Sequence, residues 1–489
     1  MQKRNAELLN EALAFHRQGR FDEAESRYKK LTWREPSSAA GFHGLGALRL
    51  YQDRPAEGRD YLARAVTLDP GSAAIACALG AALTQLKEFD GAEAELRRAL
   101  ALDPGLAEAH NNLSILLLRA LRPAEAVESS RQAVRLQPGS ADMAINLGKA
   151  LRDSGRPAEA LAAFETAVRL APELAEAHFA VATLQLAQGD FAAGWAGFEW
   201  RLRLPGFRFA IPDLGKPGWQ GEELDGRTIL LHAEQGLGDT LQFLRYVPLV
   251  AARGARVILL VQPALRRLLT GLAAVEQVVG FGDTLPDYDL HCPLMRLPRR
   301  FGTRPDSIPP IGAELSAPAE DEALWRSRLG PADGRTRIGL VWAGNPAHAN
   351  DYNRSAPLAA LAPLLARSDV HWVSLQRDVP EGDAAVLAAH PATMQTGAAL
   401  TDLAVTAGLI AGLDLVVSVD TAAAHLAGVM GRPVWLLLPF APEWRWLGTR
   451  GDSPWYPTAR LFRQPKPGDW AGLVREVETA LASGFTQSG

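Results

Sequence analysis

Small and apolar residues recur along the first two hundred positions with a period of 34 residues. Five prolines keep that spacing, at Pro36, Pro70, Pro104, Pro138 and Pro172. Two small positions recur in the same register, one at Ala12, Gly46, Gly80, Ser114, Gly148 and Ala182 and the other at Ala24, Gly58, Ala92, Ala126, Ala160 and Gly194. A third position, mostly large, recurs at Tyr28, Leu62, Leu96, Ser130, Phe164 and Phe198. Small residues let paired helices approach closely, large residues fill the space between units, and proline ends a helix. The pattern predicts stacked helix pairs.

The 34-residue unit resembles the tetratricopeptide repeat, a helix–turn–helix module. The resemblance covers residues 3–204 and implies about six repeats, the sixth without its terminal proline. Stacked repeats bury a continuous core and leave a concave groove lined by the first helix of each repeat. The expected partner is a protein bound in that groove.

Asparagine occupies three of the six equivalent groove positions, Asn10, Asn112 and Asn146. A carboxamide both donates and accepts hydrogen bonds, so it can bind a peptide backbone without demanding a sequence. These residues resemble, incompletely, the asparagine ladder of the O-GlcNAc transferase repeats, which grips an extended protein substrate. The alternative is that they are solvated polar positions on a helix.

Beyond the repeats the pattern of apolar residues changes. Residues 205–226 are rich in proline and glycine, which indicates a linker. Short apolar runs then alternate with helical stretches, which predicts βαβ units in parallel sheets. We expect two Rossmann-like halves, residues 227–330 and 331–489, after the all-α repeat solenoid. The expected strands are Thr228–His232, Arg256–Val261, Arg337–Trp342, Val370–Leu375, Leu413–Val419 and Val434–Leu438, and the expected helices are Asp239–Arg253, Asp321–Leu329, Leu358–Ala366, Asp402–Gly412 and Ala422–Val429.

Composition narrows the classes of function. The 489 residues include 51 Lys and Arg against 55 Asp and Glu, a net charge of −4. Nucleic-acid binding would need a basic excess. No apolar run approaches the roughly 18 residues of a membrane span, and the N-terminus lacks the apolar core of a signal peptide. Two cysteines are too few for a disulfide framework or a Cys-rich zinc site. We expect a cytoplasmic protein that binds no nucleic acid.

The first candidate for chemistry is the turn Glu234–Asp239 (EQGLGD), between a predicted strand and helix. A glycine-rich turn at a helix N-terminus lets a ligand reach the backbone, and the helix dipole favours an anion there. Leu241 replaces the third glycine of a dinucleotide fingerprint, and no P-loop Gly-Lys-Ser/Thr follows. Asp239 has a structural alternative as a helix N-cap.

A second strand-to-helix turn is Ser418–His425 (SVDTAAAH). Asp420 or Thr421 would cap the helix, and the backbone N–H groups that follow would point at a ligand phosphate. His425 lies about one helical turn further on. By itself this is a common α/β turn, in which a lone histidine more often packs than reacts.

Two more strand ends carry polar residues. Trp342–Pro346 (WAGNP) leads into a polar loop that ends near Arg354, which could grip a phosphate with two hydrogen bonds or simply face solvent. Gln376 directly follows another predicted strand. The aromatic segment Pro439–Trp446 would either stack on a base or sugar or pin down the C-terminal part of the chain.

Together these turns resemble glycosyltransferase family 9, the heptosyltransferase family with the GT-B fold. Gly238-Asp239 is similar to that family's Gly-Asp motif, and Asp420-Thr421 with His425 is similar to its Asp-Thr-x-x-x-His element. The resemblance covers roughly residues 220–489. It implies inverting transfer of a sugar from a nucleotide-diphosphate donor without an essential metal.

The resemblance also implies roles for single residues. Asp239 would be the general base, beside an acceptor-side loop of Gln235, Gly236 and Gly238. The donor would bind the C-terminal half, at Gly344, Asn345, Arg354, Gln376, Asp420, Thr421 and His425. Arg354 lies near the place where heptosyltransferases have a lysine. No cofactor is expected, and Asp287-Tyr288-Asp289 only imitates the metal motif of glycosyltransferases with another fold.

Three functions remain open on the sequence. The first is glycosyl transfer to a protein recruited by the repeats, for which bacterial flagellin glycosyltransferases that fuse repeats to a GT-B domain offer an architectural parallel. The second is heptosyltransferase-like transfer to a lipopolysaccharide or lipid-linked saccharide. The third is an inactive GT-B scaffold with a protein-binding array.

Overall fold

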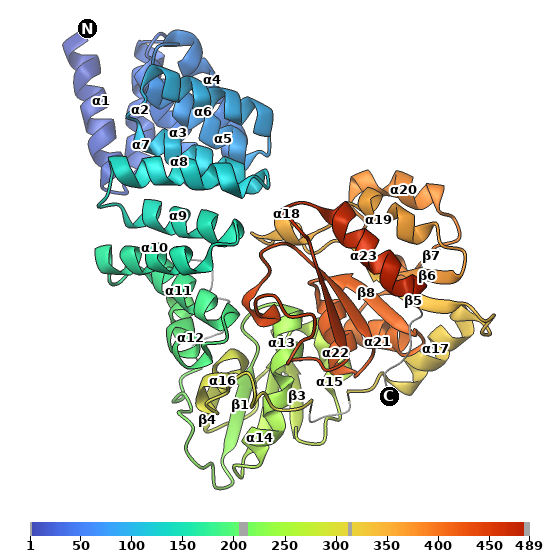
Figure 1. The fold of residues 1–489 in the computed structure, drawn as a ribbon. Helices are drawn as coiled ribbons and strands as arrows, with labels where there is room; N and C mark the ends of the chain where they lie inside the picture. The colour runs from blue at the N-terminus through green and yellow to red at the C-terminus, as the bar shows by residue number, and fades with distance from the viewer. Residues whose placement is uncertain (1, 205–213, 312–314, 484–489) are drawn as a thin grey trace. The chain divides into compact units, whose positions relative to one another are not determined.

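The computed structural model describes residues 2–204, 214–311 and 315–483. The chain forms two compact units, Met1–Glu173 and Leu174–Gly489. Of the expected linker 205–226, residues 205–213 lie outside the described residues. The first unit is helical, and the second joins one further helix pair to two parallel sheets (Figure 1).

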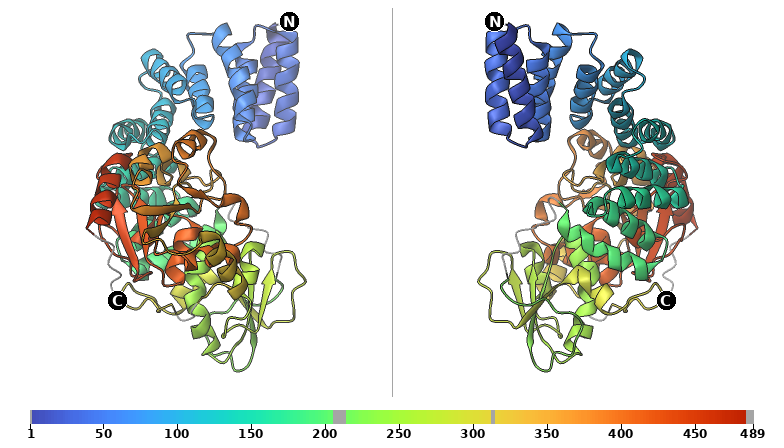
Figure 2. Two further views of the ribbon diagram at one scale, coloured as in Figure 1. Left: turned by 90° about the vertical axis from the view of Figure 1, so that its right-hand side faces the viewer. Right: turned by 90° about the vertical axis from the view of Figure 1, so that its left-hand side faces the viewer.

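Within the described residues 2–173, ten helices in five antiparallel pairs make up the first unit (Figure 2). The second helix of each pair ends two residues before one of the periodic prolines, as the pattern predicted. The helices are α1 (Gln2–Arg17), α2 (Phe21–Arg34), α3 (Ala39–Tyr51), α4 (Pro55–Leu68), α5 (Ala73–Gln85), α6 (Phe89–Leu102), α7 (Ala107–Arg119), α8 (Pro123–Leu136), α9 (Ala141–Asp153) and α10 (Pro157–Leu170).

Close helix pairing explains the small residues of the period. A Cβ atom added to Gly80 would lie 2.6 Å from Cγ of Leu96, so the larger partner fits only against glycine. The fourth repeat replaces this contact with a hydrogen bond of 2.5 Å between the hydroxyls of Ser114 and Ser130. The serine that departs from the apolar pattern is therefore matched by a second serine.

The sixth helix pair groups with the second unit. It consists of α11 (Ala175–Ala187), α12 (Phe191–Phe198) and the 3₁₀ turn η1 (Glu199–Arg203). Phe191, Trp195 and Phe198 are buried in the core that also holds the first sheet. By sequence this pair continues the repeats, but by packing it belongs to the α/β part.

The first sheet has four parallel strands in the order β3-β2-β1-β4. Its helices show one departure from expectation: the single helix expected over Asp239–Arg253 is wrong. A new helix begins there at Val247, with Pro248 in its first turn, so the stretch divides into α13, a 3₁₀ turn and α14. The elements are β1 (Thr228–His232), α13 (Leu237–Phe243), η2 (Leu244–Tyr246), α14 (Val247–Ala251), β2 (Arg256–Val261), α15 (Pro263–Leu269), β3 (Gln277–Gly280), β4 (Leu290–Pro293), η3 (Leu294–Arg296) and α16 (Leu297–Arg300).

The second sheet has six parallel strands in the order β10-β9-β8-β5-β6-β7. Apolar helices cover it, and α17 packs on α21 of this half. The elements are α17 (Ala319–Leu329), β5 (Thr336–Val341), α18 (Asp351–Arg354), α19 (Leu358–Leu365), β6 (Val370–Ser374), α20 (Ala384–Ala389), β7 (Met394–Gln395), α21 (Leu403–Ala411), β8 (Leu415–Val419), α22 (Ala422–Val429), β9 (Val434–Leu438), η6 (Trp444–Trp446), β10 (Ala459–Arg463) and α23 (Trp470–Ala482).

Strand order places the candidate turns. In each sheet the first strand in sequence lies inside, with later strands on both sides of it, so the order reverses beside β1 and beside β5. Ligands of open parallel sheets bind beyond the carboxyl ends of strands at such reversals. The turns after β1, β5 and β8 all lie at carboxyl ends of these strands. The fold thus confirms the expected pair of Rossmann-like halves.

Candidate functional site

The turn after β1 holds Asp239 firmly in place. Gly236 is the N-cap of α13, and Asp239 at the third helical position accepts a hydrogen bond of 3.0 Å from the Gly236 N–H. Asp239 is therefore not the N-cap itself, but its side chain has a structural role in the capping box at the start of α13. Gln235 is fixed through its carbonyl, which accepts from Nε2 of Gln262 at 2.6 Å.

The turn after β8 buries Asp420. Its Oδ2 accepts a hydrogen bond of 2.8 Å from the indole N–H of Trp446, and its Oδ1 lies 3.4 Å from Nε2 of His425. Burial opposes ionisation, but the hydrogen bond from His425 and the charge of Arg445 outweigh it and hold the pKa of Asp420 below its usual range. Thr421 is the N-cap of α22, and its hydroxyl bonds to Ser418 at 2.9 Å rather than capping the helix.

The two turns, more than 180 residues apart in sequence, meet in the fold. Helices α13 and α22 pack together. A Cβ atom on Gly238 would lie 2.6 Å from Cδ2 of His425, so only glycine admits the imidazole there. The structure therefore brings the Gly-Asp turn of one half against the histidine that follows Asp420 in the other.

Arg445 links the two halves and was missed from the sequence. Its guanidinium forms an ion pair with Asp239 and donates from Nε to Gln242 at 2.8 Å. Burial disfavours the cation, but the carboxylates of Asp239 and Glu443 keep the pKa of Arg445 above its usual value. The available signal was its position between Trp444 and Trp446, an unusual place for a charge.

Two further residues complete the junction. The Tyr456 hydroxyl lies 2.7 Å from Nδ1 of His425, and burial raises the pKa of Tyr456 well above its usual value. Arg245, on η2, donates to the carbonyl of Trp455 at 2.7 Å. No motif marked these residues, because their partners lie 31 and 210 positions away.

Arg354 lies beside the N-terminal end of α22. Its NH1 is 3.4 Å from the Asp420 carbonyl, and its Nε is 3.3 Å from Asp351. A Cβ atom on Gly344 would meet the Arg354 guanidinium at 2.5 Å, so glycine lets the cation lie across the end of β5. Arg354 thus lies beside both Gly344 and the Asp420 carbonyl, while the donor site itself stays a prediction.

Asn345 and Gln376 have different surroundings. Asn345 is exposed, and its side-chain oxygen closes a turn by accepting from the Ala347 N–H at 3.0 Å. Gln376 is buried, and its amide bonds to main-chain groups of Trp342, Ala343 and Asp378. Gln376 therefore fixes the main chain at the end of β5.

The aromatic segment is part of the core. Trp446 stacks on His425 with ring centroids 5.5 Å apart. Trp444 packs edge-on against Trp195 of α12 at 5.2 Å. Both tryptophans are buried, which favours the interpretation that they pin the chain rather than face a ligand.

The asparagines of the array differ among themselves. Asn10 is exposed, whereas Asn112 and Asn146 are half-buried. Asn112 donates to Sγ of Cys77 at 3.3 Å, and Asn146 donates to Oδ1 of Asn111 at 2.8 Å. Each bond reaches the preceding repeat, so these two amide N–H groups already contribute to repeat stacking.

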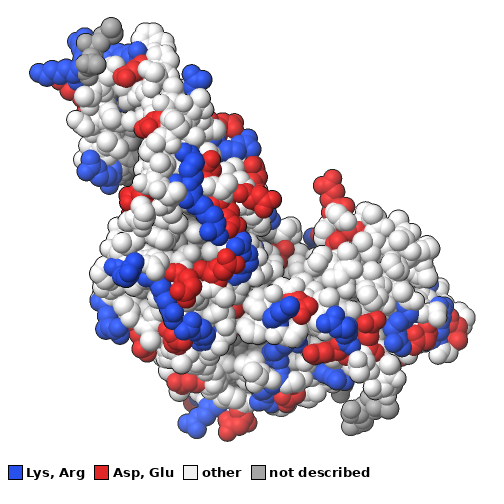
Figure 3. All heavy atoms as spheres, turned by 45° about the horizontal axis from the view of Figure 1, so that its top comes forward, with Lys and Arg blue, Asp and Glu red and all other residues white. Residues whose placement is uncertain are grey.

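Charge and metal chemistry add little to the site. Basic and acidic side chains are interspersed on the face drawn in Figure 3, with no continuous basic field. Among the described residues no group of three or more His, Cys, Asp or Glu is placed to hold a metal ion. Asp289 of the metal-like motif accepts from the Thr228 N–H at 2.8 Å and so ties β4 to β1.

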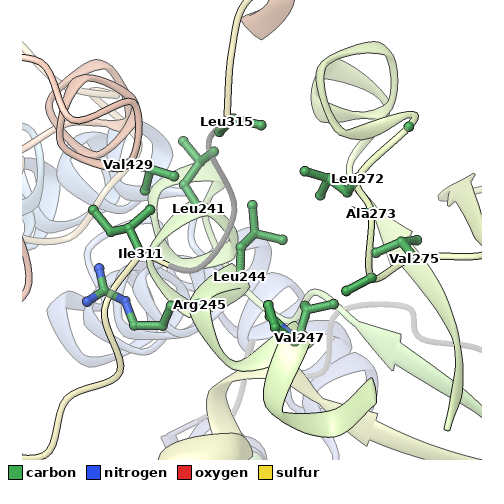
Figure 4. Close-up of a pocket in the computed structure, with 13 residues that line it drawn as sticks. Leu241, Leu244, Arg245, Val247, Leu272, Ala273, Val275, Ile311, Leu315 and Val429 are labelled. Atoms are coloured by element: carbon green, nitrogen blue, oxygen red, sulfur yellow. The ribbon is translucent and has the colours of Figure 1, made fainter. Parts of the chain in front are cut away.

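A cavity of about 580 Å³ lies beside α13, η2 and α14. Its walls are apolar apart from Arg245, and it contains none of the predicted site residues (Figure 4). It is lined by Leu241, Leu244, Arg245, Val247, Pro248, Gly271, Leu272, Ala273, Ala274, Val275, Ile311, Leu315 and Val429.

Comparison with known proteins identifies the repeats. Tetratricopeptide repeat families match residues 9–73 with 145–194 and, separately, residues 49–116. Protein FlbA of Caulobacter vibrioides (strain ATCC 19089 / CIP 103742 / CB 15) is 27% identical over 332 residues, covering 62% of this chain and 54% of that protein. The chain thus spans about half the length of this curated relative. Because the repeats make up well under half of the chain, the match extends into the α/β region.

Several solved structures are similar to part of the chain. MamA is 24% identical with a TM-score of 0.30 and covers 36% of this chain and 96% of its own. PilF of Pseudomonas aeruginosa is 18% identical with a TM-score of 0.37, and the match covers 41% of this chain and 92% of PilF. YrrB, described as a tetratricopeptide repeat protein with an unusual peptide-binding site, is 22% identical with a TM-score of 0.29. The match covers 35% of this chain and 88% of YrrB. Within the described residues, no helix is long and apolar enough to cross a membrane.

Proposed function

We propose that the protein is an inverting, metal-independent glycosyltransferase of the heptosyltransferase-like GT-B type. It moves a sugar from a nucleotide-diphosphate donor to an acceptor hydroxyl on a protein recruited by the repeats. One observation carries the proposal: two short motifs from opposite halves meet, with Gly238 against His425 and Asp239 paired to Arg445. Packing alone does not require an acidic residue and a buried arginine at that point.

Asp239 is the general base of the proposed reaction. Inverting transfer needs a carboxylate to take the proton of the acceptor hydroxyl as the sugar bond forms. A neighbouring cation disfavours proton uptake by a carboxylate. The negative charge of a bound donor competes for Arg445, so donor binding would free Asp239 for the acceptor.

Departure of the diphosphate needs charge stabilisation on the other side of the sugar. The first N–H groups of α22 have no acceptor within the helix, and the positive end of its dipole would favour the diphosphate there. Its N-cap side chain is not used for capping, since the Thr421 hydroxyl bonds to Ser418 instead. Arg354 supplies a full positive charge beside the same turn and can meet two phosphate oxygens at once.

The acceptor follows from the repeats. Tetratricopeptide arrays bind proteins along their length, so a transferase joined to one gains a high local concentration of a protein substrate. The donor, in contrast, binds through local devices, because the net charge of −4 provides no attractive field for an anion.

A donor screen tests the proposal. Nucleoside-diphosphate sugars that bind the folded protein raise its melting temperature by mass action. We expect one donor class to stabilise wild type and not Arg354→Ala, and its labelled form to transfer sugar to a protein band when lysate is added. Label in the glycolipid fraction would instead support the lipid-linked acceptor. Absence of stabilisation and hydrolysis across the panel would indicate a scaffold without activity.

A further inference from the structure

The sixth helix pair contacts both α/β halves at once. Towards the first half, the Trp195 indole donates to the Thr303 carbonyl at 3.2 Å. Towards the second half, the Ala187 carbonyl accepts from the Gly448 N–H at 3.1 Å. Gly448 lies three residues after Arg445, so this pair holds both the core of the first half and the loop that carries the site arginine.

Arg201, in the 3₁₀ turn that follows α12, makes the tightest of these contacts. Its side chain is 0% exposed, and its NH2 group donates to both carboxylate oxygens of Glu234, at 3.0 and 2.9 Å. A third bond of 2.9 Å from NH1 to the Phe198 carbonyl orients the guanidinium. Glu199 continues the network to Arg296 of the first half at 2.8 Å.

The position of Glu234 gives this ion pair its consequence. Glu234 is the first residue of the Glu234–Asp239 turn and is 4% exposed in its side chain. One guanidinium nitrogen shared between two carboxylate oxygens holds both side chains close together, and moving either would strand a charge away from water. Arg201 therefore anchors one end of the turn, while Arg445 pairs with Asp239 at the other.

We propose that Arg201 is a positioning residue for the reaction at Asp239, and that the sixth repeat serves as a third part of the catalytic unit rather than as part of the binding array. It acts through Glu234 and touches no substrate. The expected effect on kcat rests on the proposed function. The expected effect on the position of the Glu234–Asp239 turn does not.

Two measurements on the full-length protein test the inference. Arg201→Met alone would leave Glu234 buried and unpaired, so the informative variant is Arg201→Met with Glu234→Leu, which replaces the pair by apolar side chains. We expect this double variant to fold, with kcat lowered about 10- to 100-fold and the donor KM within about twofold of wild type, because misplacement by about 1 Å costs rate rather than binding. Arg203→Met, an exposed change in the same turn, is the matched control.

Hydrogen exchange reads the position of the turn without any reaction. In the double variant, amides of residues 234–241 should exchange at least about tenfold faster than in wild type, while those of the first unit and of Arg203→Met stay unchanged. Unchanged exchange in the turn would overturn the inference, even if no transfer is ever detected. Faster exchange with unchanged kcat would overturn its kinetic part and leave the proposed function standing.

Discussion

The first unit and the second unit, which contains the two α/β sheets, differ in how far apart in sequence their contacting residues lie. In the array, side-chain hydrogen bonds join neighbouring repeats. Arg49 bonds to Glu25 and Asn112 to Cys77, which are 24 and 35 positions apart. In the α/β unit, the Asp239–Arg445 pair spans 206 positions. A repeat therefore finds its partners locally, whereas the candidate site forms only when both halves have closed on each other.

The two regions also use charge differently. Many array pairs lie at the surface, such as Arg122–Glu125 with side chains 37% and 52% exposed, although Arg49–Glu25 is largely buried. Such pairs contribute little to stability and weaken with salt. In the α/β unit, Arg201–Glu234 and Arg445–Asp239 are largely buried, and losing one partner there leaves a costly unpaired charge. Removing Arg122 should therefore cost less stability than removing Arg201 or Arg445.

The largest expected effect is that of Asp239→Asn. Loss of a general base lowers kcat by about 10²- to 10⁴-fold, and the amide keeps the shape of the carboxylate. The measurement is the initial rate of labelled-sugar transfer at saturating donor. Asp90→Asn, an exposed acid in the first turn of α6, should keep the wild-type rate. Transfer by Asp239→Asn at more than a tenth of the wild-type rate would disprove the base assignment.

Next in size is the effect of Arg354→Ala on donor binding. Hydrogen bonds to a charged group contribute about 1.5–3 kcal/mol, so the donor Kd should rise about 10- to 100-fold. Calorimetric titration with the nucleotide sugar measures this. The exposed array residue Arg122 provides the comparison, and Arg122→Ala should leave the Kd unchanged. An equal Kd for Arg354→Ala and wild type is incompatible with a diphosphate contact.

Two glycine substitutions separate packing from catalysis. Gly238→Ala forces a Cβ atom against His425, and Gly148→Ala forces one against Phe164. Overpacking of this kind costs about 1–3 kcal/mol of unfolding free energy in each case. Only Gly238→Ala should also lower kcat, because only it pushes α13 away from α22. If Gly148→Ala lowers kcat on a small-molecule acceptor as much as Gly238→Ala does, the two regions are not separable in this way.

The smallest effect concerns pH. Burial, with the neighbouring charges of His291 and Arg296, lowers the pKa of His232 to about 3. Between pH 6.5 and 3 the unfolded chain binds the extra proton, so stability is full above pH 6.5 and falls as pH falls. From pH 6.5 to 5 this single group costs about 2 kcal/mol.

The His232 contribution is read from a variant, because burial also lowers the pKa of His16 and His43 in the array. Denaturant melts at pH 6.5 and 5 should show a smaller loss of stability for His232→Gln than for wild type. Equal losses would mean that His232 takes up no proton on unfolding in this range.

The sequence separation of contacts also explains which helices and strands could be predicted from the sequence. The period located every helix pair of the array, and the bounds of β1, β2, β9 and α22 match the expected segments. Runs of apolar residues did not predict four of the strands. These are β3 and β4, which are four residues long, the two-residue β7, and β10, which carries two arginines. These strands are set by pairing with neighbours rather than by their own composition.

The candidate site was predictable only where local motifs carried it. Asp239, Asp420, Thr421 and His425 lie at strand-to-helix turns and were expected there. Their partners Arg445, Trp446 and Tyr456 have no local pattern, because each acts through a contact that exists only after the halves close. The grouping of the sixth repeat with the α/β unit is likewise a tertiary fact, since its sequence still follows the period of 34.

The most direct test of a donor site at the end of β8 is a crystal structure of the protein with a bound nucleoside diphosphate. We predict that the diphosphate lies at the N-terminus of α22, with its oxygens within hydrogen-bonding distance of the Arg354 guanidinium and Arg445 turned from Asp239 towards it. A nucleotide bound elsewhere, or a diphosphate at α22 that leaves Arg354 without a phosphate contact, would contradict the account.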